Sequence, residues 1–396
     1  MKGRPEKIVW LYEKSHVKQP VVKQAIATLC EAGHDLTLVN MLNENLEGEA
    51  YHHVSMQLLF KRHKILRVVL NKLLIREYGA YKFGIAMPLT WIAYCLKHKP
   101  NIVMASMPLG LLAGWILKMI IGCRLVYYPM ELYGEQKSNS SRILSWIEHK
   151  LVKSLDSLIT QNDARGRVYV EEYGLPFKPQ VVHNYKPDPG PRKGGLLQER
   201  LTLPESAKIV LYEGIIYPGR WIDRLIKAVP LLPDDVVLVL LGPIDNRGGW
   251  WDNTMVPLIR VLGVEERFFS VPWVKPVKLP RYIKDAHVGV IIYDDSVRNN
   301  LFCEPGKLSD YVLSGLPVIA PHYETIGPKV QRLGIGEVFE SGSPENIATA
   351  IMRVLNTPPE VYAANLEKAS AEVVWSTQES KLLEGVLGEL YEAKGD

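Results

Sequence analysis

The chain has 396 residues, and at about 150 residues per domain this length predicts two or three domains. Its residues are 47% hydrophobic and 23% charged, which is ordinary for globular proteins and excludes disorder, collagen or coiled coil as a description of the whole chain. The formal net charge of +4 is far below that of a dedicated nucleic-acid binder, so we expect no nucleic-acid partner.

The cysteines and the first residues both indicate the cytoplasm. Cys30, Cys95, Cys123 and Cys303 are too irregularly spaced for a metal knuckle or a dense disulfide framework. The first three lie in apolar surroundings, so we interpret them as small buried thiols, which suits a reducing compartment. The opening residues are charged, and the apolar run 8–12 is too short for the core of a signal peptide.

The first half of the chain alternates short apolar runs with segments of helical period. Strands are predicted at 7–11, 35–39, 102–106, 124–128 and 157–160, with a helix at 21–32. Such alternation is typical of a parallel sheet that is covered on both faces.

One apolar stretch, 101–122, has the length of a membrane span. Because it contains Pro108 and Lys118, it divides better into a strand at 102–106 and a helix at 109–121. We therefore expect a buried β-α unit there.

The alternation stops at 184–195, where six of the nine residues from Pro187 to Gly195 are glycine or proline. This composition predicts a linker or hinge. Strands then resume at 208–212, 236–241, 288–293 and 316–320, with a helix at 222–228. The fold class is therefore α/β, with an N-terminal domain at 1–190, a second at 196–374, and a C-terminal helix (375–396) that packs back onto the first.

The first candidate binding loop follows the strand at 208–212. Gly214 would let a ligand approach the backbone, and Arg220, at the start of the next helix, would hold a phosphate. A tight turn with a solvated arginine is the alternative interpretation.

The second candidate lies at 304–311, where a Pro-Gly turn starts a helix. Lys307 lies in the first turn of this helix, where the positive end of the helix dipole makes a lysine unfavourable unless an anion binds there. Asp310 lies one turn further on the same face, where its carboxylate suits sugar hydroxyls. A surface lysine followed by a solvated aspartate is the alternative.

The segment Pro305–Val318 resembles the Pro-x-Lys-x-x-Glu-Tyr-x-x-x-Gly-x-Pro-Val signature of retaining glycosyltransferases of the GT-B fold, family 4. Weaker similarity in the same order extends over nearly the whole chain. The resemblance implies two Rossmann-like domains facing an interdomain cleft, of which the C-terminal one binds a nucleotide sugar.

The resemblance also implies the site residues. Arg220 and Lys307 would contact the donor diphosphate and act in catalysis, with Glu131 as a further catalytic candidate beside the alternative base His16. The donor-binding set that it implies is Gly214, Arg220, Trp273, Glu304, Gly306, Lys307, Leu308 and Asp310. Asp310 stands where the family usually has a glutamate.

The function implied is transfer of a sugar, with retention, from a UDP- or GDP-linked donor to a glycan, lipid-linked or small-molecule acceptor. The donor is a substrate, so no cofactor is expected. Because cations and a helix N-terminus would stabilise the leaving diphosphate, no metal is expected either; Asp294 and Asp295 lack other ligands nearby in the sequence. The alternatives are a hydrolase or epimerase of nucleotide sugars with the same fold, and a catalytically silent binding homologue.

The stretch 58–76 contains six Lys or Arg residues, no acidic residue and a broad apolar face. It is typical of an amphipathic helix on an anionic membrane surface, which would place the protein peripherally at the inner face of the cell membrane. A core-facing helix with a solvated basic side is the alternative.

Overall fold

The computed structural model describes residues 5–12, 19–40, 51–55, 86–132, 139–190 and 194–388. These residues divide into two compact units. One unit runs to His183 and resumes at Gln378, and the other comprises Asn184–Thr377. The chain thus passes between the units twice.

The first unit contains a seven-stranded sheet in the order β3-β2-β1-β4-β5-β6-β7, with every described pair parallel. The first strands are buried runs of apolar residues, as expected for a sheet that is covered on both faces. The strands are β1 (Lys7–Leu11), β2 (Asp35–Asn40), β3 (His52–Ser55), β4 (Ile102–Ala105), β5 (Arg124–Tyr127), β6 (Ser157–Thr160) and β7 (Gln180–Val181).

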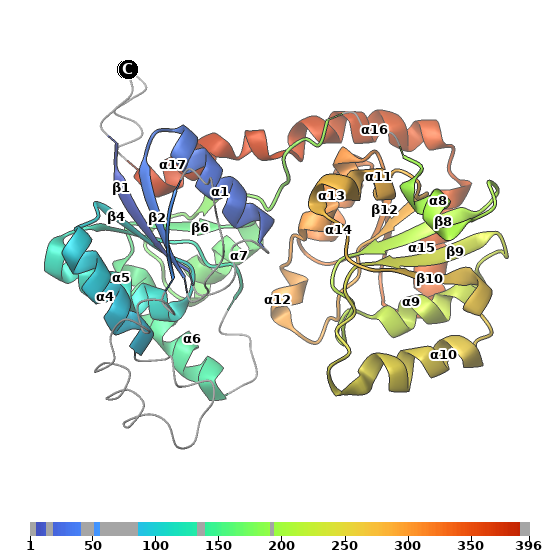
Figure 1. Ribbon diagram of the computed structural model, residues 1–396, viewed down its shortest axis with the longest axis horizontal. Coiled ribbons are helices and arrows are strands. Elements are labelled where there is room, and N and C mark those ends of the chain that lie inside the picture. Colours follow the sequence, from blue (N-terminus) through green and yellow to red (C-terminus); the bar gives the residue numbers. More distant parts are fainter. Residues whose placement is uncertain are drawn as a thin grey trace. The chain divides into compact units, whose positions relative to one another are not determined.

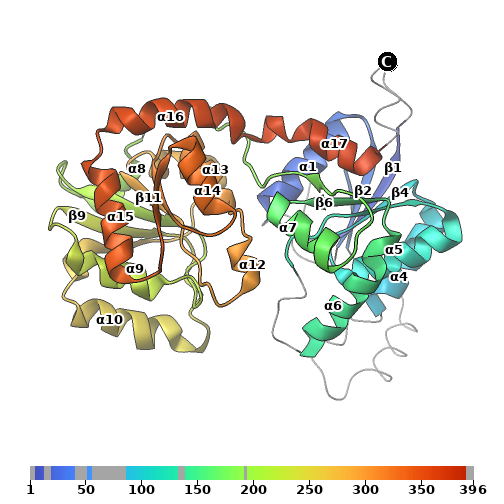
Figure 2. The ribbon, with the colours of Figure 1, turned by 180° about the vertical axis from the view of Figure 1, so that it is seen from behind.

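Helices connect and cover these strands (Figures 1 and 2). They are α1 (Pro20–Glu31), α4 (Ala86–His98), α5 (Pro108–Ile121), α6 (Asn139–Leu151), α7 (Asp163–Arg167) and α17 (Glu379–Leu387). Helix α17 packs against α1, β6 and β7, so the end of the described chain completes the first unit.

The predicted β-α unit at 101–122 is confirmed as β4 followed by α5. Pro108 occupies the first turn of α5, where its missing N–H costs nothing, and Gly122 ends the helix in the left-handed region with φ 67°. Among the described helices, none is long and apolar enough to cross a membrane.

The second unit contains a six-stranded parallel sheet in the order β10-β9-β8-β11-β12-β13. Its strands are β8 (Lys208–Glu213), β9 (Val236–Leu241), β10 (Phe268–Val271), β11 (Val288–Val290), β12 (Val318–Pro321) and β13 (Gly336–Phe339). Its helices are α8 (Leu196–Leu201), α9 (Ile222–Ala228), α10 (Val256–Val261), α11 (Leu279–Ile283), α12 (Arg298–Leu301), α13 (Gly306–Leu313), α14 (Ile326–Leu333), α15 (Pro344–Asn356) and α16 (Pro359–Glu372).

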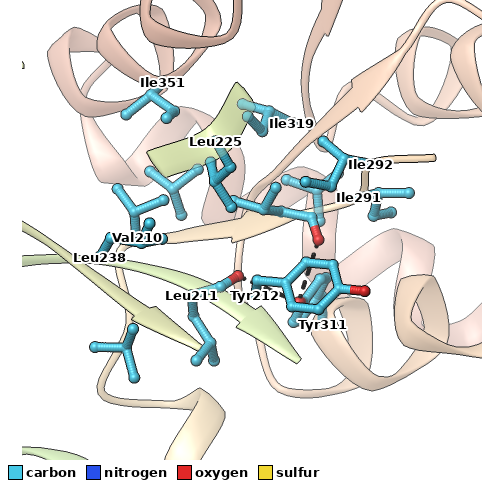
Figure 3. Packing of buried hydrophobic residues seen from close by; sticks show 14 of the residues in the cluster. Val210, Leu211, Tyr212, Leu225, Leu238, Ile291, Ile292, Tyr311, Ile319 and Ile351 are labelled. Atoms are coloured by element: carbon cyan, nitrogen blue, oxygen red, sulfur yellow. Dashed lines mark hydrogen bonds between the residues drawn. The ribbon is translucent and has the colours of Figure 1, made fainter. Parts of the chain in front are cut away.

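The helices of the second unit pack in two groups, one on each face of the sheet. Helix α9 contacts α10 and α15, whereas α13 contacts α11 and α16. Between them lies a continuous apolar core that includes Leu211, Leu225, Ile291 and Tyr311 (Figure 3). The two described sheets with helices on both faces confirm the predicted α/β class of two doubly wound domains. That the sheets face one another across a cleft stays a prediction.

The predicted linker at 184–195 is shorter in the structure, because its first residues belong to the second unit. Tyr185 is 2% exposed and packs in that unit's core. The backbone N–H of Lys186 donates to Ser309 Oγ, and its carbonyl accepts from the N–H of Trp375. The boundary therefore falls after His183, earlier than the predicted residue 190.

Three other predictions differ from the structure or lie outside its description. The predicted strand at 288–293 ends at Val290, and the helix expected from residue 375 onward is broken, with Trp375–Thr377 in the second unit and α17 in the first. The basic stretch 58–76 and His16 lie outside the described residues, so the membrane surface stays a prediction.

Candidate functional site

The strand order of the second sheet indicates where along the carboxyl ends of its strands a ligand would bind. The chain leaves β8 toward β9 and β10 on one side, and β11 lies on the other side of β8. In open parallel sheets, ligands bind beyond the carboxyl ends of the strands where the order reverses in this way. A ligand is therefore expected to contact the residues that follow β8, together with the N-terminus of α13.

Gly214 directly follows β8 and adopts φ 120°, a conformation that residues other than glycine rarely adopt. Its N–H donates to the carbonyl of Leu241 at the end of β9. A Cβ at this position would lie 3.6 Å from Lys307 Nζ. The glycine thus leaves the backbone open beside a lysine that comes from a distant part of the chain.

Lys307 is the most unusual cation of the second unit, because its residue is only 9% exposed. Its Nζ lies 3.7 Å from the centre of the Tyr212 ring, which provides a cation–π contact. Burial lowers the pKa of its ammonium group. Among the described residues, none accepts a hydrogen bond from this ammonium or forms an ion pair with it.

Arg220 also lies against aromatic rings. Its guanidinium carbon lies 4.3 Å from the centre of the Tyr293 ring and 4.8 Å from that of Tyr217. The two rings hold the guanidinium plane, and no residue in the described part of the chain accepts a hydrogen bond from its N–H groups. A planar fork held in this way suits bidentate binding of a phosphate.

The N-terminus of α13 adds to the positive potential. Gly306 and Lys307 open this eight-residue helix, whose first N–H groups have no partner within the helix. A lysine at this end is unfavourable for the isolated helix. Two cations that form no ion pair with any described residue, one of them buried, together with a helix N-terminus form an arrangement that an anion such as a phosphate would complete.

Asp310 lies close to this cluster but already has a partner that the sequence did not reveal. Lys186 Nζ lies 3.2 Å from Asp310 Oδ2, and both side chains are largely buried. The Lys186 side chain runs past Gly306, where a Cβ would meet Lys186 Cε at 3.1 Å. Glycine at 306 therefore makes room for the lysine to reach Asp310.

Glu213, the last residue of β8, is a second group that sequence reasoning missed. Burial raises the pKa of its carboxyl, and the nearby Asp310 raises it further, whereas Lys307 and Lys186 lower it. The only available signal was a glutamate at the end of an otherwise apolar strand.

Two predicted donor-binding residues already make contacts within the second unit, and their role in donor binding stays a prediction. Leu308 is 1% exposed in the core, and its N–H donates to the carbonyl of Pro305. The Glu304 side chain is 1% exposed and forms an ion pair with Lys329, whose ammonium also donates to Tyr185 Oη at 2.8 Å. The structure uses both residues for packing within the unit.

The remaining predicted residues lie elsewhere. Trp273 follows β10, which β9 separates from β8, and its side chain is 60% exposed. Glu131 belongs to the first unit, next to Met130, whose carbonyl accepts from Arg165 Nη1. Asp294 Oδ1 accepts from the N–H of Ser296, as in a turn. The structure thus brings together Gly214, Arg220, Gly306, Lys307 and Asp310.

No family model matches the chain. It is similar to two curated proteins named D-inositol 3-phosphate glycosyltransferase. The one from Mycolicibacterium gilvum is 26% identical over 247 residues, which cover 60% of this chain and 53% of the relative. The one from Thermomonospora curvata is 23% identical over 303 residues, which cover 69% and 68%. The chain thus spans about half to two thirds of the length of these relatives.

Solved structures resemble the fold over nearly its full length. Anabaena HepE in complex with UDP and glucose has a TM-score of 0.72 and 16% identity, covering 96% of this chain and 98% of that chain. Sucrose-phosphate synthase from Thermosynechococcus elongatus has a TM-score of 0.71 and 17% identity, covering 98% of both chains. WaaG, a glycosyltransferase involved in lipopolysaccharide biosynthesis, has a TM-score of 0.68 and 14% identity, covering 96% of this chain and 100% of that chain. This chain therefore has the two-domain GT-B fold of these solved structures, and its sequence is similar to that of curated glycosyltransferases.

Proposed function

We propose that the protein is a retaining glycosyltransferase that moves a sugar from a nucleotide diphosphate sugar to a glycan, lipid-linked or small-molecule acceptor. The observation that carries this proposal is the pair of cations, Arg220 and Lys307, that form no ion pair among the described residues and lie beside the N-terminus of α13. The similarity to curated glycosyltransferases supports it. The solved HepE complexes contain UDP and UDP-glucose, which favours a nucleotide sugar as the ligand of such a cluster.

In the proposed reaction, the bond between the anomeric carbon of the donor sugar and the diphosphate oxygen breaks, and an acceptor hydroxyl forms the new bond to the same carbon. Negative charge develops on the departing diphosphate. Arg220, Lys307 and the N–H groups at the start of α13 stabilise that charge, since they are held in place before the reaction begins. The acceptor's proton passes to the departing phosphate, with Glu131 of the first unit as the candidate alternative base.

The proposal includes independence from metal ions and from any cofactor. Arg220, Lys307 and the helix N-terminus supply positive charge of the kind that a divalent cation supplies at a diphosphate. Transfer should therefore continue at an undiminished rate after dialysis against a chelator, and a rate that returns only with added Mn²⁺ would contradict this part of the proposal.

The decisive experiment measures nucleotide binding by calorimetric titration. UDP, GDP, UDP-glucose and GDP-mannose are titrated into the wild type and into Lys307→Ala. We expect at least one nucleotide to bind the wild type and Lys307→Ala to weaken its binding about tenfold or more. Lys227→Ala is the matched control, because Lys227 is an exposed lysine of the same unit that pairs with Asp223 on α9.

Binding by Lys307→Ala that equals the wild type would contradict the donor site. Release of free sugar from the donor without any acceptor product would instead favour hydrolysis, and binding without any turnover would favour a silent homologue. Product formed with the anomeric configuration of the donor is the result that supports retention.

A further inference from the structure

Trp221 directly follows Arg220 and has an unusual backbone conformation for so large a residue. Its φ is 51° and its ψ is 28°, which places it in the left-handed region. A bulky residue rarely adopts this conformation, because its Cβ then crowds the following carbonyl oxygen. Such strain persists only where the surrounding structure holds it. The fold of the second unit must therefore hold the backbone of Trp221 in place.

The indole of Trp221 packs on the loop that follows β13. This strand is the third from β8 in the order β8-β11-β12-β13. A Cβ at Gly342, in that loop, would lie within 2.6 Å of three ring atoms of Trp221, so only glycine leaves room for the indole. The backbone of Gly342 lies outside the left-handed region, so it is this contact that bars a side chain. Trp221 is accordingly buried, with 5% of the residue exposed.

The loops after β11 and β12 join the indole to the surface on which Arg220 lies. Tyr323, which follows β12, packs edge-on against Trp221, with the ring centres 6.3 Å apart. Its hydroxyl donates a hydrogen bond of 2.7 Å to the carbonyl of Tyr293, which follows β11. The ring of Tyr293 is the one that lies 4.3 Å from the guanidinium carbon of Arg220. Trp221 and Arg220 therefore rest on one connected aromatic group.

The backbone is also fixed on both sides of Arg220. The carbonyl of Gly219 accepts from the N–H of Asp294 at 3.2 Å, and the carbonyl of Trp221 accepts from the N–H of Leu225 at 3.0 Å. Because Arg220 lies between these two anchors, the direction of its side chain depends on the dihedral angles that join them. A change of φ at Trp221 from positive to negative would turn the chain and move the guanidinium off its aromatic support.

We propose that Trp221 is a positioning residue of the donor site, whose left-handed backbone directs Arg220 onto Tyr293 and whose indole, packed on Gly342, holds that backbone in place. This inference rests on the proposed function, because it assumes that Arg220 binds the diphosphate of a nucleotide sugar. The guanidinium is then fixed before the ligand arrives, so less conformational entropy is lost on binding.

The test separates the backbone conformation at residue 221 from the packing of the indole. Trp221→Ala and Trp221→Asn both remove the indole, but asparagine adopts the left-handed region more readily than alanine does. UDP-glucose and GDP-mannose are titrated calorimetrically into the full chain of the wild type and of both variants. We expect Trp221→Ala to bind about 5- to 10-fold more weakly than the wild type, and Trp221→Asn to stay within about threefold of it.

A second background shows whether this effect passes through Arg220. In Arg220→Ala, the addition of Trp221→Ala should lower the remaining affinity by less than about twofold, since the side chain that Trp221 positions is absent. A loss as large as the one measured in the presence of Arg220 would overturn the inference, because the indole would then act on the fold as a whole. Equal affinities for Trp221→Ala and Trp221→Asn would overturn it as well.

Gly342→Ala displaces the indole without changing the loop that carries Arg220, and it keeps the inference testable if the variants at 221 do not fold. Its affinity should fall about threefold or more, and an unchanged affinity would overturn the inference. Val354→Ala is the control for a general loss of stability, because Val354 is buried near the other end of α15. It should melt at a lower temperature yet bind as the wild type does.

Two outcomes concern the donor site rather than Trp221. Failure of the wild type to bind either nucleotide sugar, or equal binding by Arg220→Ala and the wild type, would refute the site on which this inference rests.

Discussion

The ammonium of Lys186 lies 3.2 Å from the carboxylate of Asp310. The backbone N–H of Lys186 also donates to the hydroxyl of Ser309, the residue before Asp310, which is 123 positions further along the chain. This ion pair joins the segment that enters the second unit to the helix at the candidate site. It also determines what Asp310 offers to a ligand, since one of its oxygens already accepts from a lysine.

The first prediction concerns the stability contributed by this pair. The two side chains are 19% and 14% exposed, so removal of one partner leaves the other charged and largely desolvated. Lys186→Met and Asp310→Asn should each lower the free energy of unfolding by roughly 2 kcal/mol, and the double variant should cost less than the sum. Denaturant unfolding of the four proteins measures this coupling, and strictly additive losses would show that the pair contributes nothing.

The second prediction separates the charge of Arg220 from its shape. Arg220→Lys keeps the charge but loses the planar fork that lies over Tyr293, so nucleotide affinity should fall about tenfold, and Arg220→Ala should lower it further. Calorimetric titration provides the affinities. Arg353→Lys on α15, an exposed arginine, is the control that should bind as the wild type does. Equal affinities for Arg220→Lys and wild type would mean that charge alone is used.

The third prediction concerns the close approach of two strand ends. A Cβ at Gly242 would lie 2.0 Å from the carbonyl oxygen of Gly214, and Gly242 adopts φ 149°. Because backbone atoms cannot move aside as a side chain can, Gly242→Ala should lower the unfolding free energy by about 3 kcal/mol or more and abolish nucleotide binding.

Gly263→Ala is the comparison for that variant. Gly263 also has a positive φ, of 65°, but a Cβ there would meet nothing within 4 Å. Only the backbone strain remains, so the loss should be about 1 kcal/mol. Melting temperatures of both variants test the difference, and similar values would show that the contact with Gly214 relaxes easily.

The fourth prediction concerns a buried acid in the first unit. Glu148 on α6 is 0% exposed and accepts hydrogen bonds from the hydroxyls of Tyr127 and Tyr169 at 2.7 and 2.8 Å. Burial raises the pKa of this carboxyl to about 7, and the two tyrosine hydrogen bonds oppose the rise. The folded chain therefore binds more protons than the unfolded chain between the ordinary glutamate pKa and this raised value.

It follows that the contribution of Glu148 to stability is greatest below the ordinary pKa and is lost as the pH rises to about 7. A pKa shift of this size corresponds to a decline in the free energy of unfolding of about 3 kcal/mol at most, and this decline should be absent in Glu148→Gln. Denaturant unfolding at a series of pH values measures it. Glu171→Gln, at an exposed position of the same unit, should retain the decline.

The elements that the sequence predicted well are those whose signals are local. The β-α unit at β4 and α5 follows from one apolar run with a proline near its middle. The helix that begins at Gly306 follows from a Pro-Gly turn, and Lys307 and Asp310 share a face because they are three residues apart. The same periodicity turns Leu308, the residue after Lys307, toward the core.

The edge strands and the end of the chain show where such signals weaken. The strands β3 and β7 are short and partly polar, so no alternation of apolar residues marks them. The helix at the end was expected in one piece, but the chain passes between the units at Thr377, which no local pattern indicates.

The sequence by itself determined the α/β class, the two-domain order and the two cations of the candidate site, because helical and strand periodicity and the residues at strand ends are properties of neighbours along the chain. Only the tertiary structure decided which charges are paired. Asp310 forms an ion pair with Lys186, and Glu304 forms one with Lys329. Lys307 and Arg220 instead lie against aromatic rings. These pairings depend on burial and on contacts between distant segments, and a charge acquires its chemical role only once its surroundings exclude water.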